Sequence, residues 1–79
     1  MTTIEERIKP IIAEQFCVSE TEIDLAANIA ERYSCDSLDL VELTMAVEDE
    51  FGLEIPDETM WEFKTGQQVV DYVRANVKA

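Results

Sequence analysis

Residues 36–52 read DSLDLVELTMAVEDEFG and contain the clearest helical pattern in the chain. Asp36 suits an N-cap, because its carboxylate can accept hydrogen bonds from the free N–H groups of the first turn. Gly52 suits the position just after the last turn. Apolar residues recur every three or four positions, as on a buried helix face: Leu40, Leu43, Val47 and Phe51. The sequence therefore predicts a helix that opens at Asp36 or Ser37 and ends near Phe51.

Three more segments carry helical signals. Residues 3–16 begin with the spacing of a capping box at Thr3, and isoleucines then recur at helical spacing. Proline favours the first helical turn, so a short helix is predicted from Pro56 or Asp57 to about Phe63. Thr65 has the spacing of another capping box and precedes a run of valines at helical spacing, which predicts a last helix.

Residues 17–35 are predicted to form a long connection with a short helical turn at residues 19–22. Ile23, Leu25 and Ile29 are its expected anchors in the core. No segment alternates between apolar and polar residues for long enough to indicate a strand. The sequence therefore predicts an all-α fold in one domain over residues 1–79. The bundle has four helices, three main and one short, with a long loop between the first two main helices.

Length, charge and composition limit the function classes. The chain has 79 residues and a net charge of −12, so nucleic acid and anionic membranes are poor partners. No basic residue lies between Arg32 and Lys64, and this acidic stretch fits a basic partner or a plain solvated helix face equally well. There is no histidine, which excludes Ser-His-Asp and Cys-His sites, and two cysteines alone cannot form a structural zinc site. We expect neither an enzyme nor a metal protein.

Location is predicted from what the chain lacks. The N-terminus has no apolar signal-peptide region, and no apolar run approaches transmembrane length. Cys17 and Cys35 are too few for a disulfide framework. We expect a cytoplasmic monomer that does not insert into membranes.

Ser37 is the residue of greatest interest. It falls in the first turn of its predicted helix, where the free N–H groups and the helix dipole favour a phosphate on its hydroxyl. The other interpretation of Ser37 is an ordinary early helix residue beside the Asp36 cap. Position and composition alone favour this second interpretation.

A family resemblance reverses that preference. Residues 35–43, CDSLDLVEL, resemble the Asp-Ser-Leu signature of acyl carrier proteins. The similarity extends through residues 45–51 and 54–58, and the opening residues 3–8 and closing residues 71–73 also resemble the family. It covers essentially the whole chain and implies a discrete, type II-like carrier.

The resemblance implies a function for Ser37 as the attachment point of 4′-phosphopantetheine. A phosphopantetheinyl transferase would supply this covalent group from coenzyme A, with Asp36 helping the transferase to hold its metal ion. The arm would carry acyl groups as thioesters to fatty-acid, polyketide or related lipid biosynthesis enzymes. Two alternatives stay open: an aminoacyl or peptidyl carrier, and an unmodified acidic adaptor protein.

A partner-binding surface and an acyl pocket are also predicted. Acidic residues near one side of the central helix would meet basic docking surfaces, with an apolar stripe beside them. The predicted surface comprises Asp36, Leu38, Asp39, Val41, Glu42, Met45, Glu48, Asp49, Asp57 and Trp61. The predicted acyl pocket comprises Ala46, Val47, Val69 and Val73.

Some residues depart from the family pattern. Cys35 lies two positions before Ser37 and is either inert or able to exchange thiols with the arm. Met60 and Trp61 stand where small or acidic residues are usual, and Gly66 is expected to open space near the cargo pocket. These departures favour a dedicated pathway over the housekeeping fatty-acid role.

Overall fold

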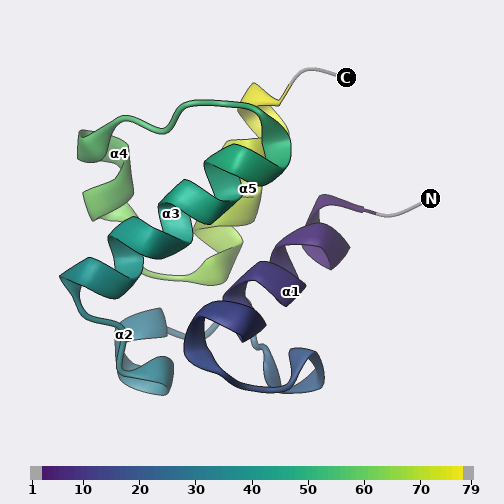
Figure 1. Ribbon diagram of the computed structural model, residues 1–79, viewed down its shortest axis with the longest axis vertical. Coiled ribbons are helices and arrows are strands. Elements are labelled where there is room, and N and C mark those ends of the chain that lie inside the picture. Colours follow the sequence, from purple (N-terminus) through teal and green to yellow (C-terminus); the bar gives the residue numbers. More distant parts are fainter. Residues whose placement is uncertain (1–2, 78–79) are drawn as a thin grey trace.

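Five α-helices make up most of residues 3–77, which the computed structural model describes (Figure 1). They are α1 (Ile4–Phe16), α2 (Ile29–Tyr33), α3 (Ser37–Phe51), α4 (Asp57–Glu62) and α5 (Gly66–Asn76). A 3₁₀ turn (Glu20–Glu22) lies between α1 and α2, where the sequence predicted a helical turn. Within these residues β-type pairing is limited to one isolated antiparallel bridge between Asn28 and Thr65. The all-helical bundle is confirmed.

The helix ends follow from local side chains. Thr3 caps α1, because its hydroxyl accepts the Glu6 N–H at 3.1 Å. Thr65 and Gln68 form a complete capping box at the start of α5. Gly52 ends α3 with φ +64°, a backbone conformation that other residues adopt only with strain.

Helix α2 corrects the prediction of a long loop between the first two main helices. Asn28 caps it, because the side-chain oxygen accepts the Glu31 N–H at 3.1 Å. Ile29 is buried in the core, and Ser34 ends the helix in the left-handed conformation. Five residues are too few to show a helical period, so packing at Ile29 decides this element.

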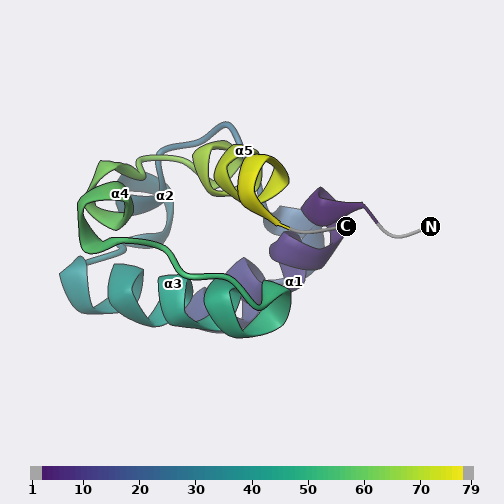
Figure 2. The same cartoon turned by 90° about the horizontal axis from the view of Figure 1, so that it is seen from above.

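The core lies between α3 on one side and α4 and α5 on the other (Figure 2). Helix α1 packs against both α3 and α5. The side chains that are almost completely buried come from these three helices: Ile8, Ile12, Leu43, Val47, Val69, Val70 and Val73. The predicted inner face of α3 is confirmed at Leu40, Leu43 and Val47.

The connection before α2 is fastened to the start of α5. The Gln67 N–H donates to the Leu25 carbonyl at 2.8 Å, and the Ile29 N–H donates to the Lys64 carbonyl at 2.9 Å. A Cβ atom at Gly66 would lie 2.8 Å from Leu25 Cδ2 and 3.2 Å from Ile12 Cδ1. The lack of a side chain at Gly66 therefore lets Leu25 and Ile12 pack closely against the start of α5. The expectation that it opens space is wrong, because Leu25 fills that space.

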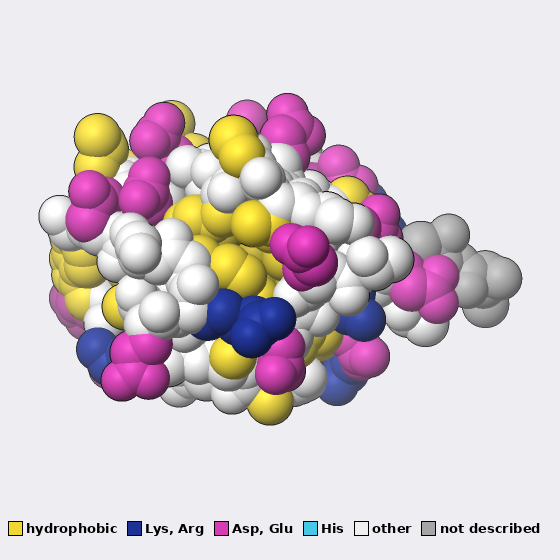
Figure 3. Space-filling view, turned by 90° about the horizontal axis from the view of Figure 1, so that it is seen from below, with side chains coloured by type: hydrophobic (Ala, Val, Ile, Leu, Met, Phe, Trp, Pro, Cys, Tyr) yellow, Lys and Arg dark blue, Asp and Glu magenta, His cyan; other side chains and the backbone are white. Residues whose placement is uncertain are grey.

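Aromatic packing fastens α2 to the end of α1. The rings of Phe16 and Tyr33 stack with centroids 5.2 Å apart. Arg32 lies over the Tyr33 ring at 5.7 Å and donates to the Glu22 carbonyl at 3.1 Å. Figure 3 views this end of the bundle. It shows hydrophobic side chains gathered in a central hollow, basic side chains along the lower edge of the hollow, and acidic side chains on the surrounding surface.

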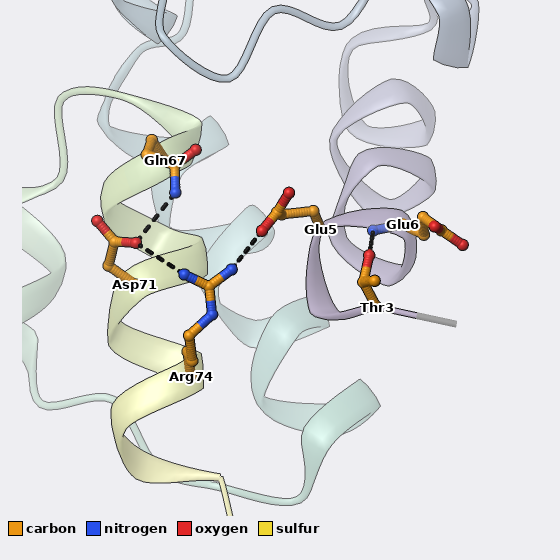
Figure 4. Close-up of polar contacts among 6 residues, drawn as sticks. All are labelled: Thr3, Glu5, Glu6, Gln67, Asp71 and Arg74. Carbon is orange, nitrogen blue, oxygen red and sulfur yellow. Dashed lines mark hydrogen bonds and ion pairs between the residues drawn. The ribbon is translucent and has the colours of Figure 1, made fainter. Parts of the chain in front are cut away.

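Ion pairs link the main helices at the surface. Arg7 of α1 binds the Glu50 carboxylate at 2.9 Å and lies over the Phe51 ring at 4.4 Å. Arg74 of α5 pairs with Glu5 of α1 and with Asp71 (Figure 4). These pairs are exposed, so each contributes at most about 1 kcal/mol.

No helix within residues 3–77 combines the length and the apolar character that crossing a membrane requires.

Candidate functional site

Ser37 is the first residue of α3 and is exposed to solvent. Asp36 and Asp39 form a capping box around it. The Asp39 N–H donates to Asp36 Oδ1 at 2.9 Å, and the Asp36 N–H donates to Asp39 Oδ2 at 3.3 Å. Within residues 3–77 the Ser37 hydroxyl makes no side-chain hydrogen bond. The box satisfies two backbone donors and leaves this hydroxyl available for chemistry.

The capping role of Asp39 was missed in the sequence. The signal was present as the Asp-x-x-Asp spacing at the start of α3. It was assigned only to the acidic surface, although Asp39 is half-buried and bonded to backbone.

A cavity of about 430 Å³ opens beside Ser37. Its walls come from α2, the first turn of α3, and the segment from α4 to α5. Most lining side chains are apolar: Ile29, Ala30, Cys35, Leu40, Trp61 and Phe63. The polar lining residues are Asn28, Asp36, Ser37 and Lys64. An exposed hydroxyl at the rim of a mainly apolar hollow fits a covalently attached organic arm.

The comparison with protein families identifies such an arm. The family model described as the phosphopantetheine attachment site matches residues 6–73, which span nearly all of the helical bundle. This chain belongs to that family. Members bind 4′-phosphopantetheine covalently, so the protein is a phosphopantetheine carrier protein.

A groove of about 350 Å³ separates α3 from α4 in the carrier protein. Val41 and Met45 line it from α3, and Asp57 and Trp61 line it from α4. The exposed fractions of Leu38, Met45 and Trp61 are 65%, 57% and 49%. Trp61 lines both this groove and the cavity beside Ser37.

The acids of the predicted surface divide into four exposed and two half-buried residues. Asp36, Glu42, Asp49 and Asp57 are exposed, and of these Asp36 also caps α3, whereas Asp39 and Glu48 are half-buried. Glu48 Oε2 accepts the Ile55 N–H at 2.7 Å and so holds the loop before α4. The predicted roles of all these acids in partner binding stay predictions.

The predicted acyl-pocket residues are not together in one hollow. Val47, Val69 and Val73 are almost completely buried in the core. Ala46 is half-buried in a surface groove between α1 and α3, beside Ile11. None of the four lines the cavity beside Ser37. The interior acyl pocket stays a prediction.

Cys35 lies on the cavity wall and is partly buried. Burial raises the pKa of its thiol, and the nearby carboxylates of Asp39 and Asp36 raise this pKa further. A thiol with a raised pKa is protonated at neutral pH and is a poor nucleophile. This favours the inert interpretation of Cys35 over thiol exchange with the arm.

Proposed function

We propose that this carrier protein is an acyl carrier protein, modified at Ser37, that serves enzymes of fatty-acid, polyketide or related lipid biosynthesis. The observation that carries the proposal is the exposed Ser37 hydroxyl, which opens α3 beside a mainly apolar cavity. When attached, 4′-phosphopantetheine supplies an arm whose terminal thiol holds acyl groups as thioesters. The protein presents the arm and catalyses no reaction itself.

The modification is a phosphoryl transfer to Ser37. Its Oγ bonds to the phosphorus of the phosphopantetheine group, the phosphoanhydride bond of coenzyme A breaks, and adenosine 3′,5′-bisphosphate leaves. The hydroxyl proton passes to a base of the transferase. The free N–H groups at the start of α3 favour the phosphate. The exposed Asp36 carboxylate adjoins it, where the transferase would place its metal ion.

Docking to enzymes would use the face that carries the acids and the exposed apolar side chains. Complementary charge speeds encounter with basic surfaces. Exposed aromatic and apolar groups such as Trp61 and Met45 supply contacts that exclude water. A cytoplasmic monomer is part of this proposal, and the free thiols of Cys17 and Cys35 fit a reducing compartment.

Intact mass tests the proposal. The apo protein is incubated with coenzyme A, Mg²⁺ and a broad-specificity phosphopantetheinyl transferase. We expect a mass gain equal to one phosphopantetheine in the wild type and none in Ser37→Ala. Ser34→Gly is the matched control, because Ser34 is also exposed and already has a positive φ. An unmodified wild type, under conditions that load a known carrier, would support the adaptor alternative instead.

A further inference from the structure

Lys64 and Trp61 both line the cavity beside Ser37. Lys64 is the only basic side chain that lines this cavity. It is also the only basic residue between Arg32 and Arg74 in a chain of net charge −12. Within residues 3–77 the ion pairs are made by Arg7 and Arg74, so Lys64 pairs with no described carboxylate. An exposed lysine in so acidic a chain is available for another anion.

The modification of Ser37 creates that anion. A phosphodiester adds a negative charge next to Asp36 and Asp39, whose carboxylates are already held by the capping box. The negative charge of the phosphodiester and the carboxylates of Asp36 and Asp39 repel one another, and this repulsion is stronger where water is partly excluded. Lys64 lines the same cavity as Ser37 and can offset this charge from the other side.

The apolar part of the cavity suits the rest of the arm. Its volume of about 430 Å³ falls within the range of sites that hold small organic groups. Ile29, Leu40 and Phe63 form its buried floor, and the half-exposed Trp61 forms a wall. Pantetheine has an apolar branched end next to its phosphate and amide groups further along, so it can place methyl groups against this floor.

We propose that the cavity holds the pantetheine portion of the arm. Lys64 is paired with the phosphodiester, and the Trp61 indole packs against the pantetheine. Lys64 is then a positioning residue that turns the arm into the cavity. The proposal rests on the proposed modification of Ser37. An arm held in this way contacts the same indole that borders the groove between α3 and α4.

The fluorescence of Trp61 provides a direct test, because it is the only tryptophan in the chain. Apo and fully modified proteins are compared after intact mass has verified each state. We expect modification to move the emission maximum to shorter wavelength, because the arm shields the indole from water. We expect Lys64→Gln to be modified as fully as the wild type but to lose this shift. Salt at 1 M, where the Debye length is about 3 Å, should reduce the wild-type shift.

Controls separate positioning from damage to the fold. Lys64→Arg keeps the charge and should keep the shift. Lys9→Gln removes a lysine of α1 that lines no part of the cavity and should also keep it. The thermal midpoint of apo Lys64→Gln should stay close to that of the apo wild type, because Lys64 is exposed and makes no ion pair within residues 3–77. NMR shifts of the Ile29 and Leu40 methyl groups on modification give a second measurement.

Three outcomes would overturn the inference: equal emission of apo and modified wild type, an unchanged shift in modified Lys64→Gln, or unmoved methyl signals. Absence of any mass gain would instead reject the modification of Ser37, so the two failures can be distinguished.

Discussion

The inner and outer faces of α3 carry similar side chains and differ in what covers them. Leu43, on the inner face, is 1% exposed, whereas Leu38, five residues earlier on the same helix, is 65% exposed. The inner face packs against α1 and belongs to the core that α5 also lines, whereas no described residue buries the outer face at Leu38 or Met45. One helix thus stabilises the bundle with one face and leaves apolar side chains exposed to solvent on the other, where we propose that partners dock.

Truncating these two leucines gives the largest expected difference. Leu43→Ala should lower the free energy of unfolding by about 2–5 kcal/mol, because it leaves a cavity in a close-packed core. Leu38→Ala should change it by less than about 0.5 kcal/mol, since the side chain is already in water. Urea denaturation followed by circular dichroism measures both. Equal losses of unfolding free energy for the two variants would show that the outer face stabilises the bundle as much as the inner face does.

The packing beneath the inner face can be tested at Gly66. Gly66→Ala should lower the free energy of unfolding by about 1 kcal/mol, the lower end of the range for overpacking, because the new Cβ would approach Leu25 Cδ2 to 2.8 Å and this end of a flexible side chain must shift. Leu25→Ala removes the obstructing atom, so the double variant should be more stable than the sum of the single losses predicts. Gly52→Ala is the control, since its Cβ would meet no atom within 4 Å and only φ strain remains. Its loss should add to that of Leu25→Ala. Simple additivity at Gly66 would contradict the close approach.

The sequence predicts α3 well because its signals are local. The Asp36 cap, the spacing of Leu40, Leu43 and Val47, and Gly52 all lie within one segment and agree with one another. Helix α2 was missed because it is short and depends on the burial of Ile29 in a core built from distant segments.

The candidate site divides in the same manner. The position of Ser37 at a capped helix start is local and was predicted. The cavity beside it joins residues 28–30, 35–40 and 61–64, and no periodicity reveals that these segments meet. Val47, Val69 and Val73 were predicted to line an acyl pocket, and that pocket stays a prediction. Their nearly complete burial depends on how distant segments pack into one core, which no local pattern shows.

Asp36 breaks the simple division between the two faces, because it is exposed and yet caps α3. Asp36→Ala should lower the free energy of unfolding by about 1 kcal/mol, because the Asp39 N–H loses its acceptor. Asp36→Asn keeps an oxygen acceptor and should cost only a few tenths of that. Both variants remove the carboxylate proposed to assist the transferase, so both should be modified at Ser37 more slowly than the wild type. Thermal melts and the initial rate of mass gain separate the two roles. If Asp36→Asn is modified at the wild-type rate, the Asp36 carboxylate only caps the helix, and the transferase recognises other groups on the outer face.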